Sequence, residues 1–126
     1  MGPGYLIDTN TIIDYLENRL PVSSTNLIDR ISIQLSVISR IEILAWQKAS
    51  DEHLRVLNGF MSASTVFNLD ENIILKSIEI RKIYRLKLPD AIIAATAATK
   101  NLKLLTRNLK DFERIIDLQC IDPHRL

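Results

Sequence analysis

Residues 88–106 read LPDAIIAATAATKNLKLLT, and this stretch predicts a helix followed directly by a strand. Leu88-Pro89 breaks the chain, and Asp90 opens the expected helix, where the helix dipole stabilises an anionic side chain. Lys103 to Thr106 then read as a short strand. Four alanines with i, i+3, i+4 and i+7 spacing share one helix face: Ala91, Ala94, Ala95 and Ala98. This stripe allows close packing, which would hold Asp90 in a fixed place.

Strands and helices alternate on both sides of this stretch. Short apolar or alternating runs predict strands at residues 5–7, 33–37, 65–67, 103–106 and 118–121. Apolar spacing predicts helices near residues 9–16, 26–31, 39–46, 51–61, 70–83, 90–98 and 110–115. This alternation indicates an α/β fold, in which helices cover both faces of a short central parallel sheet.

Polar residues mark the expected helix starts. Thr9 or Asn10 is predicted to cap the first helix. Ser39 and Glu42 have the spacing of a capping box at the start of the third helix. The long helix that begins at Asp70 carries three isoleucines on its apolar positions: Ile74, Ile78 and Ile83.

Length and composition fit one globular domain spanning residues 1–126. Hydrophobic residues make up 47% of the chain and charged residues 25%, which excludes an intrinsically disordered protein. The formal net charge of +1 neither indicates nor excludes a nucleic-acid partner. Function must therefore be read from the placement of charges, because their sum does not decide it.

The chain has one cysteine and no long apolar segment. Cys120 has no partner for an intrachain disulfide, so the reducing cytoplasm is the expected location. No segment has the length of a membrane helix, and the start MGPGYLID lacks the pattern of a signal peptide. The Gly2-Pro3-Gly4 start fits either a native sequence or a cloning remnant.

Four acidic residues follow predicted strands or open predicted helices: Asp8, Glu42, Asp90 and Asp111. Taken singly, each has a structural explanation as a helix cap or a solvated helix start. In a parallel sheet, however, the carboxyl ends of the strands meet at one rim, where ligands bind. We therefore expect these carboxylates to gather there. The other acids are expected at helix starts or on exposed faces: Asp14, Glu17, Asp29, Asp51, Glu52, Asp70, Glu71, Glu79 and Asp117.

Clustered carboxylates suit phosphodiester cleavage only if their repulsion of the phosphate is reversed. Bound Mg²⁺ or Mn²⁺ reverses it, polarises the phosphoryl oxygen and lowers the pKa of bound water. An all-oxygen ligand set favours these hard ions. Zinc is not expected, because His53, His124 and Cys120 form no ligand motif.

Four segments in chain order resemble the PIN domain, specifically the VapC-type toxin ribonucleases of toxin–antitoxin pairs. They are LIDTN at residues 6–10, the Glu42 helix, LPDAIIAATA at residues 88–97, and TRNLKDF at residues 106–112. The resemblance runs from residue 5 to about residue 121, and its last two motifs are the most specific. It implies a PIN-like three-layer α/β/α fold and Mg²⁺- or Mn²⁺-dependent cleavage of RNA.

The resemblance also implies roles for the acidic residues. Asp8, Glu42 and Asp90 correspond to the metal-binding core of the catalytic site. Asp111 takes a more variable fourth position, for which Asn108 is a rival or a companion.

Further residues near the rim are implied to support the site or the substrate. Asn10 resembles the residue that orients the first aspartate, and Thr106 and Asn108 resemble residues that line the pocket. The bases nearest the rim in sequence are candidate contacts to RNA: Arg40, Lys87, Arg107 and Lys110.

The same resemblance implies protein partners. A small VapB-like antitoxin would wrap around the toxin and block the pocket, and the chain itself would form a homodimer. No membrane partner is expected. Trp46, Phe60 and Met61 fit either an interface or the core, and the sequence does not separate the two.

Other functions remain open at this point. A PIN-like protein can act mainly as a non-catalytic protein- or RNA-binding module, and metal-dependent cleavage would distinguish the enzyme from it. A receiver domain needs an acidic pair after the first strand, but Asp8 stands alone, and Phe67-Asn68-Leu69 offers no phosphoacceptor. An aspartyl phosphatase needs a second acid where Asn10 stands.

Overall fold

The computed structural model describes residues 4–126. Gly2 and Pro3 of the N-terminal start, and residues 1–3 of the predicted domain, lie outside the described residues. The strands are β1 (Tyr5–Ile7), β2 (Gln34–Ser36), β3 (Thr65–Phe67), β4 (Lys103–Leu105) and β5 (Cys120–Ile121). The helices are α1 (Thr9–Leu16), α2 (Val22–Arg30), α3 (Val37–Leu44), α4 (Asp51–Ser62), α5 (Glu71–Tyr84), α6 (Leu88–Thr99), α7 (Leu109–Phe112) and the 3₁₀ helix η1 (Pro123–Arg125).

The strands pair in parallel, as predicted, but in two separate ladders. β4 lies between β1 and β5 in one ladder, and β2 pairs with β3 in the other. β2 lies beside β1, where the side-chain amide of Gln34 donates a hydrogen bond to the carbonyl of Tyr5 at 3.3 Å. A side chain therefore connects the two parts of the sheet.

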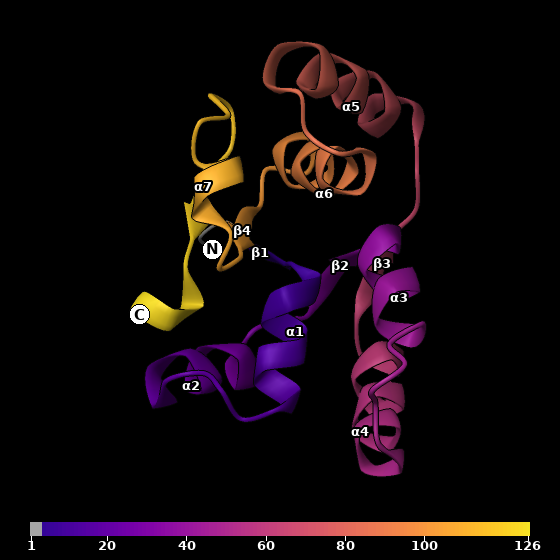
Figure 1. Cartoon of the computed structure of the whole chain (residues 1–126), viewed down its shortest axis with the longest axis vertical. Coiled ribbons are helices and arrows are strands. Elements are labelled where there is room, and N and C mark those ends of the chain that lie inside the picture. Colours follow the sequence, from indigo (N-terminus) through magenta and orange to yellow (C-terminus); the bar gives the residue numbers. More distant parts are fainter. Residues whose placement is uncertain (1–3) are drawn as a thin grey trace.

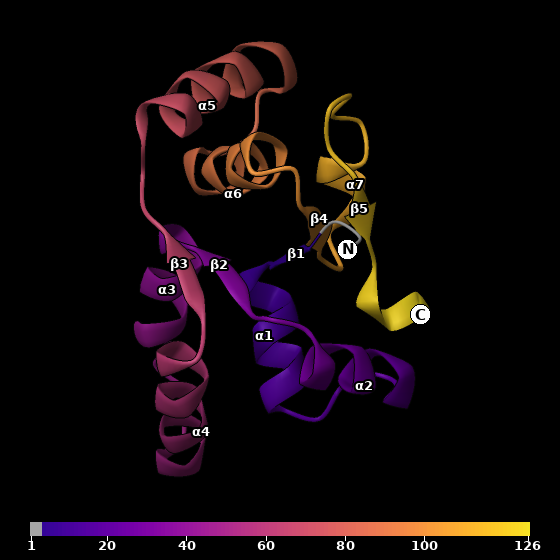
Figure 2. The same ribbon diagram turned by 180° about the vertical axis from the view of Figure 1, so that it is seen from behind.

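Successive residues of the central strands face opposite layers of helices, because side chains alternate along a strand. Leu6 and Leu104 pack into a core with α5 and α6. Ile7 and Leu105 pack into a second core with α1 to α4. Figures 1 and 2 show α5 and α6 on one side of the strands, and α1 and α2 on the other. The predicted α/β/α layering is confirmed.

The alanine-rich helix α6 is enclosed between α5 and the strands (Figure 1). Ala91, Ala94 and Ala95 are fully buried, in agreement with a stripe that packs closely. Helix α5 turns Ile73, Ser77 and Ile80 towards this layer. The three isoleucines that mark it in the sequence lie on its outer face instead, together with a leucine, and are exposed: Ile74, Leu75, Ile78 and Ile83.

Helices α1 and α3 begin earlier than the capping patterns predicted. Asp8, not Thr9 or Asn10, caps α1, and Ser36, not Ser39, caps α3. The cap residue of a helix has an extended backbone, and Asp8 and Ser36 are the last extended residues of their segments. The predicted capping box of Ser39 is therefore wrong.

Two further helix starts also differ from the prediction. Helix α6 begins at Leu88 with Pro89 in its first turn, so this pair opens the helix, as proline's fixed φ allows. Helix α2 begins at Val22, directly after Pro21. None of the helices described is long and apolar enough to cross a membrane.

Trp46, Phe60 and Met61 are the three large side chains that the sequence assigns to either the core or an interface. Phe60 and Met61 pack against the core that contains α1 to α4. Trp46 stacks on His53, with 5.0 Å between the ring centroids. Phe60 and Met61 thus contact the core, whereas Trp46 is partly buried and belongs to neither core.

Candidate active site

Asp8 lies directly after β1, at the carboxyl edge of the sheet, and is 5% exposed. Its Oδ2 accepts hydrogen bonds from Thr106 Oγ1 at 2.7 Å and Asn10 Nδ2 at 3.2 Å. Its Oδ1 accepts one from the backbone N–H of Thr9 at 2.8 Å. Among residues 4–126, no basic side chain lies within 4.0 Å of this carboxylate. Neutral donors orient Asp8 but do not compensate its charge.

Glu42 is an exposed residue of α3 that reaches the start of α1. Thr9 Oγ1 lies 2.6 Å from Glu42 Oε1 and 3.0 Å from Ser39 Oγ. Each hydroxyl has one proton to donate, so a chain in which Ser39 donates to Thr9 and Thr9 to Glu42 satisfies all three groups. Because Thr9 follows Asp8, this chain holds Glu42 beside the first aspartate.

Asp90 and Asp111 approach from two other segments. Asp90 lies in the first turn of α6 and is partly buried. Asp111 lies in α7, and its Oδ2 accepts a hydrogen bond from Asn108 Nδ2 at 3.0 Å. Asn108 also donates its backbone N–H to Thr106 Oγ1 at 3.0 Å. Residues 106–111 thus connect the surroundings of Asp8 with those of Asp111.

The carboxylates influence one another electrostatically. The pKa of Asp8 is raised to about 6, mainly by burial. The hydrogen bonds from Thr106 and Thr9 lower it, and the charges of Asp90 and Glu42 contribute to the rise. Burial, followed by the charges of Glu42 and Asp111, also raises the pKa of Asp90. The four acids expected at the rim therefore influence one another through their charges. Burial remains the largest cause of the raised pKa values of Asp8 and Asp90.

The donor chemistry of this site fits Mg²⁺ or Mn²⁺, since all four groups offer carboxylate oxygens. A cation would also relieve the unfavourable charging of Asp8 and Asp90. Within residues 4–126, no three His, Cys, Asp or Glu side chains are placed closely enough to hold a metal ion. The side chains would have to turn towards an ion, and Glu42 would then give up its hydrogen bond from Thr9.

The four candidate RNA contacts fall into two groups. Arg40, Lys87 and Lys110 are exposed, and in the described part of the chain none lies within 4.0 Å of a carboxylate. Arg107 differs, because its Nη1 donates to both carboxylate oxygens of Asp14, at 2.9 and 3.1 Å.

The expectation that Asp14 lies at a helix start or on an exposed face is wrong. Its side chain is 1% exposed, and its Oδ2 also lies 2.8 Å from His124 Nε2. Asp14 follows Thr11 by three residues on α1, and both belong to the face of this helix that is buried. The three-residue spacing from Thr11 was the sequence signal that could have indicated the burial of Asp14. The partners of Asp14 come from segments about a hundred residues away, which no local pattern reveals.

The structure gives two hydroxyl residues, Thr9 and Ser39, a role other than the helix caps that the sequence predicts. Thr9 and Ser39 were assigned to helix caps, although Thr9 bonds Glu42 and Ser39 is buried inside α3. The signal was their position next to the candidate acids in both motifs. Asn10 and Thr106 lie against Asp8, in the region that the sequence assigned to them.

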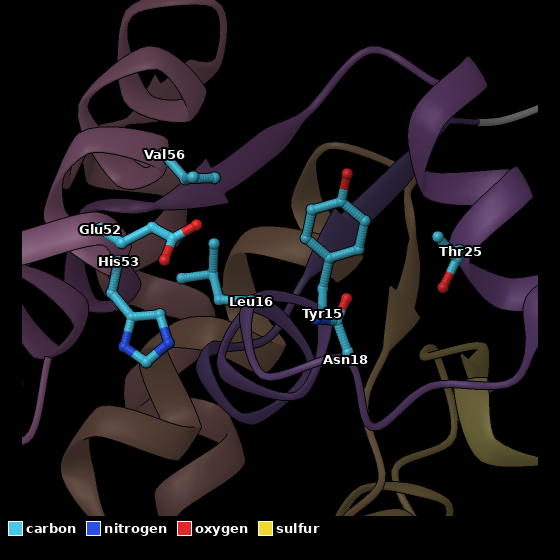
Figure 3. Close-up of a pocket in the computed structure, with 7 residues that line it drawn as sticks. All are labelled: Tyr15, Leu16, Asn18, Thr25, Glu52, His53 and Val56. Atoms are coloured by element: carbon cyan, nitrogen blue, oxygen red, sulfur yellow. The ribbon is translucent and has the colours of Figure 1, made fainter. Parts of the chain in front are cut away.

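A separate cleft of about 330 Å³ lies between α1, α2 and α4 (Figure 3). Its lining includes Tyr15, Glu52, His53 and Val56, and none of the four clustered acids. The Asp29 carboxylate, which accepts a hydrogen bond from Tyr15, raises the pKa of that phenol to about 12. This cleft lacks the grouped acids of the sheet edge and is not the candidate catalytic centre.

Comparisons with known proteins agree with the geometry. Ribonuclease VapC1 of Methanocaldococcus jannaschii is 33% identical over 120 residues, covering 87% of this chain and 79% of that protein. The tRNA(fMet)-specific endonuclease VapC of Salmonella typhimurium is 27% identical over 131 residues, covering 94% and 96%.

Solved structures give the same result. A DNA-bound VapBC from Salmonella typhimurium aligns with a TM-score of 0.82 and 25% identity, covering 96% of this chain and 98% of that one. A toxin–antitoxin complex from Klebsiella pneumoniae aligns with a TM-score of 0.77 and 31% identity, covering 95% and 98%. The model of the PIN domain family matches residues 5–118. As its motifs predicted, this chain belongs to the PIN domain family.

Proposed function

We propose that this chain is a metal-dependent endoribonuclease, the toxin of a toxin–antitoxin pair, which hydrolyses RNA phosphodiester bonds at the Asp8, Glu42, Asp90 and Asp111 site. One observation carries the proposal: four carboxylates from separate segments share one field at the sheet edge. The names of the relatives, ribonuclease and endonuclease VapC, support RNA as the substrate.

Mg²⁺ or Mn²⁺ is the proposed cofactor, with Asp8, Glu42 and Asp90 as its main ligands and Asp111 as the fourth. When bound, such an ion would stabilise charge on the phosphate and activate water. The chain prepares three of these ligands by hydrogen bonds: Thr106 and Asn10 orient Asp8, Thr9 orients Glu42, and Asn108 orients Asp111.

Arg40, Lys87 and Lys110 are the proposed contacts to the RNA backbone. Each is exposed, and within residues 4–126 none is paired with a carboxylate, so each charge is available to a phosphate. They lie on α3, before α6 and on α7, the same segments that carry Glu42, Asp90 and Asp111. Each base thus lies within three residues of one of these acids in the sequence.

A cleavage assay tests the proposal. The purified protein should cleave RNA in the presence of Mn²⁺ or Mg²⁺ and should stop when EDTA is added. Asp90→Asn should abolish cleavage. Asp51→Asn makes the same chemical change in the first turn of α4, away from the cluster, and should leave cleavage intact.

Two results would count against the enzyme. Full activity of Asp90→Asn, with its fold verified by circular dichroism, would remove the carboxylate site from the reaction. RNA binding without cleavage at any metal concentration would favour the alternative, a PIN-fold module that binds RNA or protein without catalysis.

A VapB-like antitoxin is the proposed protein partner. The support is that similar solved structures are VapBC and toxin–antitoxin complexes. The product of a short neighbouring gene, co-expressed with this chain, should co-purify with it and suppress its RNA cleavage. Unaffected cleavage in the co-purified complex would contradict a role as antitoxin.

A homodimer is the proposed assembly of the chain. The support is the outer face of α5, where Leu75 is 55% and Ile83 is 63% exposed, since such apolar faces commonly bind a partner. Light scattering should give twice the chain mass of 14.4 kDa. Leu75→Lys with Ile78→Lys should yield a monomer, and a monomeric parent protein would reject the proposal.

A further inference from the structure

We propose that Asp14, Arg107 and His124 form a positioning unit, which fixes residues 106–111 and thereby the carboxylates of Asp8 and Asp111. Arg107 is then a positioning residue and not a contact to RNA. This inference rests on the proposed function, because it concerns the geometry of the same site.

The starting point is the burial of Asp14. Asp8 and Asp14 are the two buried acids among residues 4–126. A carboxylate removed from water needs compensating charge and hydrogen bonds. Arg107 Nη1 supplies both, at 2.9 and 3.1 Å, and His124 Nε2 lies 2.8 Å from the same carboxylate, within hydrogen-bond distance. Because Asp14 lies inside the fold on α1, it is a fixed anchor to which the more exposed Arg107 is tied.

The second step leads from Arg107 to the active site. The backbone N–H of Arg107 donates to Asn10 Oδ1 at 3.4 Å, and Asn10 in turn donates to Asp8. On one side of Arg107, Thr106 donates to Asp8, and on the other, Asn108 donates to Asp111. A displacement of Arg107 therefore changes the surroundings of both carboxylates together.

The third step includes the C-terminal segment. His124 lies in η1, which α2 holds through two hydrogen bonds: Ser24 Oγ to the carbonyl of Pro123, and Ser23 Oγ to that of Leu126, the latter at 2.7 Å. Asp14 thus joins α1, the segment after β4 and the chain end at one point. The site depends on residues that touch none of its reacting groups.

The test compares Arg107→Ala with Lys110→Ala, a matched control that removes an exposed cation from the same segment. For each we would measure kcat and KM for RNA cleavage, Mn²⁺ affinity by calorimetry, and hydrogen exchange of residues 106–111. Arg107→Ala should lower kcat and Mn²⁺ affinity by about tenfold or more, as loss of a residue that orients metal ligands does. It should also accelerate exchange of residues 106–111, with little change in KM.

Lys110→Ala should instead raise KM and leave Mn²⁺ affinity and exchange unchanged. Arg107→Lys, which keeps the charge, should restore part of kcat. In an Asp14→Asn background, Arg107→Ala should have little further effect, because the two residues act as one unit. If Asp14→Asn does not fold, the three single-site variants of Arg107 and Lys110 still decide the proposal.

The opposite pattern would overturn the inference. If Arg107→Ala raises only KM, with Mn²⁺ affinity and exchange unchanged, Arg107 is a contact to RNA. If the parent protein neither cleaves RNA nor binds Mn²⁺, the proposed function fails. The exchange of residues 106–111 in metal-free Arg107→Ala then still decides whether Arg107 positions this segment: faster exchange supports the inference, and unchanged exchange rejects it.

Discussion

The two ends of α1 each hold one buried carboxylate, in opposite electrostatic surroundings. Asp8, at the N-terminal end, is surrounded by hydroxyl, amide and backbone donors, and burial raises its pKa to about 6. Asp14, in the last turns, is bonded by Arg107 and by His124. The same helix thus carries one acid whose charge is uncompensated and one whose charge is already matched.

This difference separates the proposed metal ligand, Asp8, from the proposed positioning residue, Asp14. An uncompensated buried carboxylate gains from binding a cation, whereas a carboxylate with two basic partners has nothing further to gain. Asp8 shares its field with Asp90 and Glu42, which increases the attraction for positive charge. Burial alone therefore does not identify a metal ligand. Asp8 is a stronger candidate ligand than Asp14 for the proposed ion, because Asp14 already has Arg107 as its partner.

Removing each carboxylate should show the largest contrast in the rate of RNA cleavage. Asp8→Asn should reduce kcat by a factor on the order of 10³ or more, because a ligand of the proposed metal is lost. Asp14→Asn should reduce it by about 10- to 100-fold, because only the orientation of the ligands suffers. Single-turnover cleavage under saturating Mn²⁺ measures both. Equal losses in the two variants would erase the distinction between site and support.

The stability of the metal-free protein should depend on pH through Asp8. Between its ordinary pKa of 3.8 and about 6, the folded state keeps a proton that the unfolded state loses, so the free energy of unfolding falls as pH rises. Asp8→Asn lacks this penalty. Its free energy of unfolding should equal that of the parent near pH 3.5 and exceed it above pH 6 by about 1 to 3 kcal/mol.

Urea titrations in EDTA at several pH values measure this difference. Asp51→Asn, which makes the same change at an exposed carboxylate, serves as the control. A constant difference between Asp8→Asn and the parent from pH 3.5 to pH 7 would mean that Asp8 is not the titrating group.

Asp14→Asn should change stability in the opposite direction. It removes the anion that Arg107 and His124 share and should lower the free energy of unfolding by about 2 kcal/mol at pH 7. The loss is moderate because both partners are partly exposed and regain water. Urea unfolding at pH 7 in EDTA gives the value, and a stabilised Asp14→Asn would make the two buried acids equivalent.

Much of the fold could be predicted from local pattern. The strand at the apolar run Tyr5–Ile7, the burial of Ala91, Ala94 and Ala95 on α6 and the alternation of elements all depend on neighbouring residues, and they were confirmed. The outer face of α5 was not apparent, because its isoleucines occur on both faces and only packing against α6 decides which are buried. Helix starts shifted because the caps Asp8 and Ser36 compete with polar residues one to three positions later.

The candidate site was predictable only where its residues belong to motifs. Asp8, Glu42, Asp90 and Asp111 lie in recognisable segments. The fold brings them near enough for the charges of Asp90 and Glu42 to act on Asp8, and those of Glu42 and Asp111 to act on Asp90. Asp14 remained hidden, because an acid on a helix is ordinarily exposed, and its burial depends on Arg107 and His124, which are distant in sequence. Contacts between segments this far apart follow from the assembled fold and not from local spacing.

The smallest expected effect concerns a cation that, unlike Arg107, has no acid within 4.0 Å among the described residues. Lys87 precedes α6, and its charge lowers the pKa of Asp90, which places it beside the cluster. Because its charge is available to a phosphate, Lys87→Ala should raise KM about two- to fivefold. It should also reduce the salt dependence of RNA binding by about one phosphate contact. kcat and Mn²⁺ affinity should stay unchanged, since no ligand moves.

Filter binding at several salt concentrations gives the slope of the logarithm of the RNA-binding constant against the logarithm of salt concentration. It should be measured for Lys87→Ala and Arg107→Ala side by side. The comparison of the two ends of α1 predicts that Lys87→Ala alone lowers this slope, because the charge of Arg107 is already matched by Asp14. If both variants lower the slope equally, the ion pair between Arg107 and Asp14 opens when RNA binds. Arg107 then exchanges Asp14 for a phosphate of the RNA.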